Sequence, residues 1–314
     1  MPRRFWLIVT LALVCVSSAA AADPIAFLVA LRGKVEVTPA LAKQAQRATL
    51  GRPLERGDRV IVGPASGASI FFSDGNVIEL AENSSVSVGG RVAAKGKPEL
   101  SAEVFSNVSK FITGGSRQTG LMALAPMRGA GDAPVPIIVA PRRTEITDDR
   151  PSFDWRLIEG ATRYRVTLSG DQGELWNREA TIDSLAYPAD VPALAPETDY
   201  LWQVQAFSDR GPLRDEDSYF RVLSPKEAEA VHDHIARIRS SAGGNGQAVR
   251  YLMGSYLFGR GLYRDACAEF EALCRLAPET AGAHEALGNA YRAVGLMDLA
   301  ATEFQKALAL GREQ

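Results

Sequence analysis

The sequence predicts a multidomain protein in which β domains precede helices, and two observations support this fold class. Polar and apolar residues alternate from residue 25 to 88 and again from 138 to 223, as they do in half-buried β-strands. After Pro225 the apolar spacing becomes helical, and two segments superimpose at a shift of 34 residues. We therefore expect a small all-β domain over 23–90, a β-sandwich over 138–224 and a short array of helical hairpins over 247–314.

The first 22 residues are typical of a secretion signal. Arg3 and Arg4 precede an apolar run from 5 to 16, and Ala20 to Ala22 offer a small-residue cleavage site. The alternative is a membrane anchor, but an apolar run of about 12 residues is shorter than the roughly 20 that a transmembrane helix requires. We expect cleavage before Asp23 and export to the periplasm of a Gram-negative bacterium. The mature chain is expected to have no transmembrane segment.

Composition and cysteine content exclude two further features. A net charge of -2 gives no basic surface for a phosphate backbone, so no nucleic acid partner is expected. Cys267 and Cys274 are seven residues apart on one predicted helix, about 10 Å at 1.5 Å per residue. This separation exceeds the roughly 7 Å limit on the Cα distance across a disulfide. We expect no intrachain disulfide.

Turn residues divide the first β segment into short strands. A Leu-x-Gly-x-Val opening from Leu31 to Val35 is followed by a Leu-x-x-Gly-Asp step, an Asp-Gly hairpin and an Asn-Ser turn. In this order the motifs resemble the extracytoplasmic FecR-like domain. The resemblance implies an all-β fold with turns at Gly33, Gly57, Asp58, Asp74, Gly75 and Asn83. It also implies recognition or signal relay outside the inner membrane.

Residues 91–137 are predicted to contain a short helix and a linker. Leu100, Val104, Val108 and Ile112 would form one apolar stripe on that helix. Gly, Pro and Ala are frequent from residue 114 to 136, which favours a linker over regular structure.

The second β segment has regularly spaced alternating runs that predict an antiparallel sandwich. Its order of Phe-x-Trp, Tyr-x-Val, Leu-x-Pro-x-Thr-x-Tyr and Tyr-x-Trp-x-Val-x-Ala resembles a fibronectin type III domain of the immunoglobulin-like class. Alternation places four aromatic residues in the core rather than on a sugar-stacking surface: Trp155, Tyr164, Tyr200 and Trp202. Trp176 lies near a turn and is the aromatic residue expected to be exposed.

The carboxyl-terminal repeat resembles the tetratricopeptide repeat, with small residues where two helices cross and large ones beside them. The packing positions are Gly254, Gly261, Ala266, Phe270, Leu287, Gly288, Tyr291, Gly295, Ala300 and Phe304. The resemblance implies a groove that binds protein segments, with Arg250, Tyr251, Asn289 and Arg292 as its candidate residues. A helix and connector over 225–246 would pack against the first repeat. The last hairpin has no polar capping helix, which suggests self-association or docking on a partner.

Catalytic and metal-binding patterns are weak in this sequence. His232 and His234 are two apart on a helix and face different directions, so both are expected to be solvated. His284-Glu285 begins like a zinc-protease motif, but position 288 is Gly and no second ligand follows. Asp58 and Asp74 each adjoin a glycine, as turn-forming residues do. Because Glu79 lies in the same domain, a catalytic pair of carboxylates among these three residues stays open. We expect no enzyme activity, no cofactor and no metal.

Three binding-type modules favour a non-enzymatic periplasmic adaptor. Its β domains would recognise an envelope protein or ligand, and its helical repeats would bind a second protein. Two alternatives stay open: an envelope protein that binds peptidoglycan or another polysaccharide, and an extracytoplasmic signal-relay component related to FecR-type regulators.

Overall fold

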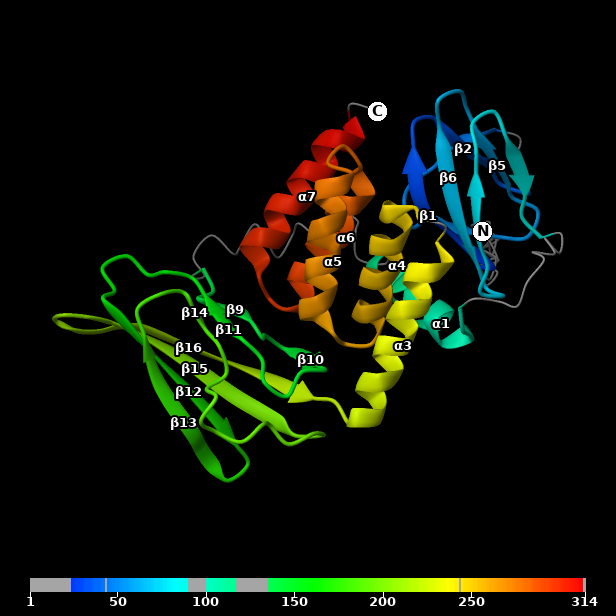
Figure 1. Cartoon of the computed structure of the whole chain (residues 1–314). Coiled ribbons are helices and arrows are strands. Elements are labelled where there is room, and N and C mark those ends of the chain that lie inside the picture. Colours follow the sequence, from blue (N-terminus) through cyan, green and yellow to red (C-terminus); the bar gives the residue numbers. More distant parts are fainter. Residues whose placement is uncertain (1–23, 43, 90–99, 117–134, 243, 313–314) are drawn as a thin grey trace, which may run out of the picture.

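The computed structural model describes residues 24–42, 44–89, 100–116, 135–242 and 244–312 (Figure 1). The predicted signal peptide and most of the predicted linker lie outside these ranges. Within them, no helix combines the length and apolar character needed to cross a bilayer.

The first β domain is a sandwich of two four-stranded sheets. Their strand orders are β4-β1-β6-β7 and β3-β2-β5-β8. Apolar residues of both sheets form one core, which includes Leu28, Val37, Val60 and Ile70. The strands are β1 (Ala26–Arg32), β2 (Val35–Thr38), β3 (Gln46–Arg47), β4 (Pro53–Leu54), β5 (Arg59–Val62), β6 (Gly67–Phe72), β7 (Val77–Leu80) and β8 (Ser85–Ser87).

The motif residues of this domain lie in its turns. Positive φ angles occur at Gly33, Gly57, Gly75 and Asn83, where glycine and asparagine are favoured. A Cβ atom on Gly33 would lie 2.4 Å from Ser66 Oγ, so this turn excludes larger residues. The Asp58 carboxylate is buried and accepts hydrogen bonds from the backbone of Ala40 and Glu55.

The expectation of half-buried strands is wrong for β1 and β6, which are buried on both faces. Leu28 and Ile70 face the core of the sandwich, whereas Phe27, Val29 and Phe71 belong to a second core outside it. That second core is shared with helices from later in the chain, which explains why alternation alone underestimated the burial of these strands.

Helix α1 (Ala102–Ser116) joins the first β domain to the carboxyl-terminal helices. The predicted stripe is buried: Leu100, Val104, Val108 and Ile112. On the adjacent surface, the ring of Phe111 lies 4.9 Å from that of Phe258 and 5.0 Å from that of Phe270. The short helix predicted ahead of the linker is therefore a structural member of the shared core.

Residues 137–223 form a second sandwich, with sheets ordered β10-β16-β15-β12-β13 and β14-β11-β9. The four aromatic residues predicted for the core are all buried. Tyr200 Oη accepts a 2.8 Å hydrogen bond from Ala195 N, a tyrosine-corner contact typical of immunoglobulin-like sandwiches. The strands are β9 (Ile138–Ala140), β10 (Thr144–Ile146), β11 (Phe153–Trp155), β12 (Arg163–Gly170), β13 (Gly173–Ala180), β14 (Ser184–Leu185), β15 (Asp199–Ser208) and β16 (Gly211–Val222).

The prediction of an exposed Trp176 is wrong. Its side chain is 5% exposed, and its ring makes edge contacts with Phe153 and Tyr187. The side chain of Trp176 points into the core because it shares a face with Leu168, its partner across β12 and β13. Trp176 is therefore not available for stacking on a sugar.

Two helical hairpins follow the helix α3 (Pro225–Ser241): α4 (Gly246–Gly259) with α5 (Tyr263–Leu276), and α6 (Ala281–Ala293) with α7 (Met297–Arg312). Both hairpins have the same close contact. A Cβ atom on Gly254 would lie 2.5 Å from the Phe270 ring, and one on Gly288 would lie 2.8 Å from the Phe304 ring. Only glycine allows the helices to approach this closely.

Ser224 and Glu227 form a capping box at the start of α3. The Ser224 hydrogen bonds hold the pKa of Glu227 below its usual value. A carboxyl group whose pKa is lowered by folding stabilises the protein at pH values above its unfolded-state pKa of about 4.3. This stabilisation is lost as the pH falls through the pKa of the folded state. We expect Ser224→Ala to cost about 1 kcal/mol at pH 7 and less at pH 3, measured by urea unfolding. An equal loss at both pH values would contradict this account.

Candidate binding cleft

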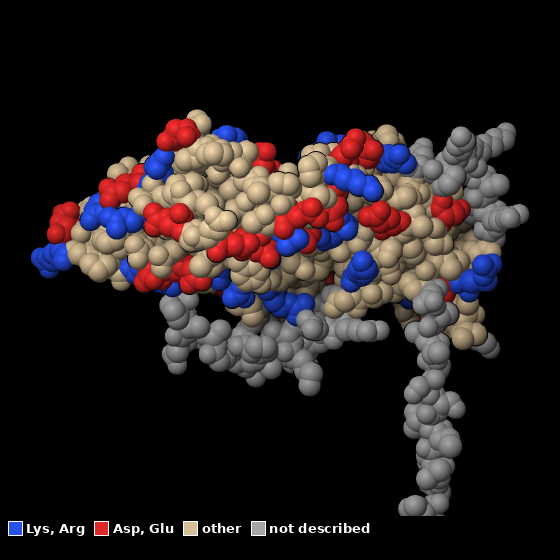
Figure 2. All heavy atoms as spheres, turned by 90° about the horizontal axis from the view of Figure 1, so that it is seen from below, with Lys and Arg blue, Asp and Glu red and all other residues tan. Residues whose placement is uncertain are grey.

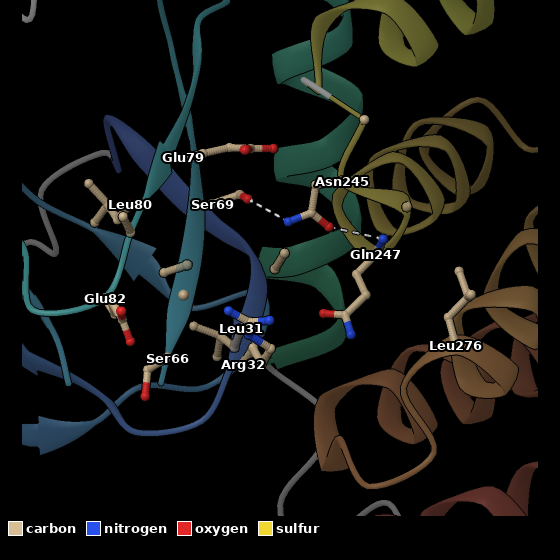
Figure 3. Close-up of a pocket in the computed structure, with 16 residues that line it drawn as sticks. Leu31, Arg32, Ser66, Ser69, Glu79, Leu80, Glu82, Asn245, Gln247 and Leu276 are labelled. Atoms are coloured by element: carbon tan, nitrogen blue, oxygen red, sulfur yellow. Dashed lines mark hydrogen bonds between the residues drawn. The ribbon is translucent and has the colours of Figure 1, made fainter. Parts of the chain in front are cut away.

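An open cleft lies between the first β domain and the helices (Figure 3). It has a volume of about 900 Å³. One wall consists of β1, β6 and β7, and the other consists of the start of α4 and the end of α5. The cleft exists because the shared core below it, around Phe27 and Phe71, fixes the sheet against the helices.

Asn245 joins the two walls at the base of the cleft. Its Oδ1 accepts hydrogen bonds from the backbone of Gln247 and Ala248, which caps α4. Its Nδ2 donates to Ser69 Oγ on β6 at 3.1 Å, as Figure 3 shows. One side chain thus orients both the helix and the sheet.

We expect Asn245→Ala to cost about 2 kcal/mol of unfolding free energy, because it removes both the helix cap and the donor to Ser69. Asn245→Asp is the matched variant, since a carboxylate keeps the cap but cannot donate to Ser69. It should recover at least half of the loss, measured by urea unfolding. Equal destabilisation by both variants would show that the cap is unimportant.

The remaining lining combines apolar and charged side chains. On the sheet wall, Leu31 and Leu80 pack partly into the core of the sandwich, whereas Leu276 at the end of α5 is 54% exposed. Arg32 and Glu79 supply both signs of charge. A concave surface with an exposed leucine and a charged rim is typical of an interaction site.

A second hollow of about 450 Å³ continues the cleft past Arg32 and Gln247, which line both. Its β wall includes Arg47 to Leu50, and its helical wall is the loop of residues 277–280 together with the first residues of α6. Together the two hollows form one groove along the interface of the β domain and the hairpins.

The predicted groove of the helical repeat differs from this cleft. Tyr251 is buried under Gly51: a Cβ atom added to Gly51 would lie 2.2 Å from the Tyr251 hydroxyl. The ring of Tyr251 packs against Phe111 of α1. Asn289 is also buried, and it accepts a hydrogen bond from Arg292. The prediction of an open groove is wrong at Tyr251 and Asn289, because the chain's own β domain and α1 cover Tyr251 and because Asn289 faces the protein interior.

The half-buried guanidinium of Arg250 also has a partner inside the protein. It forms a 2.6 Å ion pair with Glu269 of the same hairpin. Arg250 therefore stabilises the contact between α4 and α5.

Polar side chains that could suggest chemistry are engaged in structural contacts. Asp74 caps its own turn by accepting from Asn76 N. His234, expected to be solvated, is half-buried and joins Ser101 before α1 to Tyr256 of α4, whereas His232 is exposed. These hydrogen bonds fix α1 and α3 against α4.

Charged residues are interspersed on the face shown in Figure 2. Acidic and basic side chains alternate over the sandwich and the helices without a broad region of one sign. This distribution offers no extended cationic track to a phosphate backbone on that face.

One cluster of metal-ligating side chains occurs within the described residues: Cys274, His284 and Glu303. A sulfur, a ring nitrogen and a carboxylate oxygen from these residues all lie within 4.8 Å of one another. Burial raises the pKa of the Cys274 thiol to about 12. Sequence analysis found no second ligand for His284, because its neighbours in space come from the helices before and after it.

No family model and no curated protein matches the sequence. Several solved β domains match part of it. A cell surface anchoring domain is 27% identical over 24% of this chain and 96% of its own, with a TM-score of 0.22. The sixth fibronectin type III domain of human fibronectin type III domain containing protein 3 is 20% identical over 28% and 82%, with a TM-score of 0.21.

Fibronectin(III)-like modules of Clostridium thermocellum CbhA are 12% identical over 66% of this chain and 82% of their own, with a TM-score of 0.22. TM-scores this low imply nothing about shared binding or activity. The description of residues 137–223 as a fibronectin type III-like sandwich rests on its two sheets and its tyrosine contact.

Proposed function

We propose that this protein is an exported, non-enzymatic adaptor that binds a segment of an envelope protein in the cleft between its first β domain and its helices. The proposal combines a secretion signal, a FecR-like domain over 23–90 and two tetratricopeptide repeats over 247–314. The observation that supports it most directly is the open cleft to which both modules contribute.

The cleft favours a protein segment over a small substrate. It is open to solvent, it continues into a second hollow, and Leu276 is exposed on its helical wall. An extended segment with an apolar side chain would bury Leu276, while Arg32 and Glu79 would orient its polar groups.

The position of α1 modifies how the adaptor works. Because α1 covers the inner face of the first hairpin, the β domain and the repeats would act on one partner through a shared cleft. Separate binding of two partners by two independent modules is a weaker proposal than it was from sequence alone.

Photocrosslinking in intact cells tests this proposal. A photoreactive amino acid at position 276 or 79 should capture the same discrete envelope protein, identified by mass spectrometry, because Glu79 is exposed and lines the sheet wall of the cleft. Position 213 is the control, because Leu213 is 45% exposed on the other β domain. Leu276→Glu should abolish capture from position 79.

Two results would contradict the adaptor. Equal capture from position 213 would show that the crosslinks are unspecific. Recovery of glycan fragments from positions 79 and 276, without a protein, would instead favour an envelope protein that binds polysaccharide.

A further inference from the structure

The cluster of Cys274, His284 and Glu303 lies where three helices of the two hairpins meet. Cys274 is in the last turn of α5, His284 is in the first turn of α6, and Glu303 is on α7. His284 and Glu303 are buried, at 6% and 8% exposure, whereas Cys274 is half-buried. The chain thus brings a sulfur, a nitrogen and an oxygen donor to one point near the surface.

Hydrogen bonds fix the orientation of the His284 ring. Its Nε2 lies 2.8 Å from the carbonyl oxygen of Pro278, and a carbonyl oxygen only accepts, so Nε2 carries a hydrogen. Its Nδ1 lies 2.6 Å from Glu303 Oε2, so a single proton lies between these two atoms. Nδ1 is therefore the nitrogen that faces the cluster.

The surroundings match those of metal ligands in proteins. A metal-binding histidine commonly donates its other ring N–H to a carbonyl, as His284 does to Pro278. The carboxylate of Glu303 is held from its other oxygen by Lys306 Nζ at 2.7 Å. Both ligands are thus oriented by groups that do not themselves bind the metal.

The first hairpin provides an internal comparison. Arg250 and Glu269 occupy the positions that correspond, at the shift of 34, to His284 and Glu303. They form an ordinary ion pair at 2.6 Å. In the second hairpin the arginine is replaced by a residue that can bind a metal, and a thiol lies beside it.

We propose that Cys274, His284 Nδ1 and Glu303 form a site for a transition metal ion, with Zn²⁺ as the expected occupant. Thiolate, imidazole and carboxylate are the three ligand types that Zn²⁺ accepts. Bond lengths of about 2.0–2.3 Å place tetrahedral ligands about 3.3–3.7 Å apart. The donor atoms, all within 4.8 Å of one another, reach this geometry by small side-chain rotations.

Binding exchanges protons for the metal. Zn²⁺ forms bonds to Cys274 Sγ, His284 Nδ1 and Glu303 Oε2, the thiol proton and the proton between His284 and Glu303 pass to solvent, and water occupies the fourth position. About two protons are therefore released for each zinc ion bound. The side chain of Lys306, on the Glu303 side of the cluster, is 53% exposed, so this side lies close to solvent.

The site would also stabilise one wall of the binding cleft. Pro278, which His284 contacts, belongs to the loop of residues 277–280 that lines the second hollow. A metal that links α5, α6 and α7 would hold this loop in place. This consequence is separate from the proposed adaptor function, and the site can be tested without any partner.

Cobalt and zinc titrations of the tag-free, full-length exported protein test the proposal. We expect one Co²⁺ per chain, a sulfur-to-cobalt charge-transfer band, and displacement of Co²⁺ by Zn²⁺. Cys274→Ser should abolish the band and weaken zinc binding at least tenfold. Cys267→Ala is the matched control, because Cys267 lies seven residues earlier on α5 and outside the cluster; it should retain the band.

A second measurement does not depend on any variant. Zinc titration calorimetry in two buffers of different ionisation enthalpy should report about two protons released per ion. The proposal is overturned if the unmodified protein binds no zinc, if no protons are released, or if Cys274→Ser binds zinc as tightly as the unmodified protein while its circular dichroism shows that it is folded.

Discussion

Gly259→Ala is expected to separate α1 from α4 and to lower the free energy of unfolding by about 3 kcal/mol. A Cβ atom at position 259 would lie 2.3 Å from the backbone oxygen of Asn107 on α1 and 2.8 Å from its Cα. Backbone atoms inside a helix cannot move aside as a flexible side chain can. The added methyl group must therefore displace α1 as a whole, and with it the contact of Phe111 with Phe258.

Urea unfolding and limited proteolysis measure this effect, because a displaced α1 exposes the core that it shares with the first β domain. Gly114→Ala is the matched control. It makes the same substitution within α1, where a Cβ atom would meet nothing within 4 Å. The control should be neutral or slightly stabilising, since alanine favours helix over glycine. Similar stability of both variants would mean that the close contact has no energetic importance.

The order of the elements could be predicted from sequence, whereas the contacts between domains could not. Periodicity identified both β segments and the buried stripe of α1, because it reflects burial of one face. It gave no sign that Phe27 and Phe71 belong to a second core, since their partners lie on helices more than 30 residues away. The cleft depends on that core and was therefore also beyond sequence reasoning.

The cluster around His284 was partly predictable. The shift of 34 relates His284 to Arg250 and Glu303 to Glu269, so a contact between α6 and α7 could have been expected from a contact between α4 and α5. Cys274 could not be placed in the same way, because it contacts the next hairpin rather than its own. Its position depends on how the two hairpins stack, which no single repeat specifies.

Arg142→Met is expected to cost about 3–5 kcal/mol and to uncouple the second sandwich from the helices. Arg142 is 7% exposed. Its Nη1 lies 2.5 Å from Glu216 Oε1, and its Nε donates at 2.7 Å to the carbonyl oxygen of Val294, at the end of α6. Methionine retains the apolar stem but leaves the Glu216 carboxylate and the Val294 carbonyl without this donor.

Glu216 cannot relax easily once the guanidinium is gone. Its other oxygen accepts hydrogen bonds from the backbone of Ile137 and Ile138, which hold it at the edge of the sandwich. The variant therefore leaves a half-buried carboxylate with backbone donors but no counter-charge, which is the costly half of breaking an ion pair inside a protein. The link to α6 is lost at the same time.

Two spectroscopic signals distinguish loss of stability from loss of coupling. After the signal is removed, the remaining tryptophans, Trp155, Trp176 and Trp202, all lie in the second sandwich, so fluorescence reports that domain while far-ultraviolet circular dichroism is dominated by the helices. In urea, the two transitions of Arg142→Met should separate by more than those of the unmodified protein. Arg163→Met is the control, since Arg163 and Glu179 are 42% and 56% exposed and such pairs contribute less than about 1 kcal/mol. Unchanged midpoints in Arg142→Met would show that the sandwich and the helices are held together by other contacts, such as the 3.5 Å pair of Arg264 with Asp154.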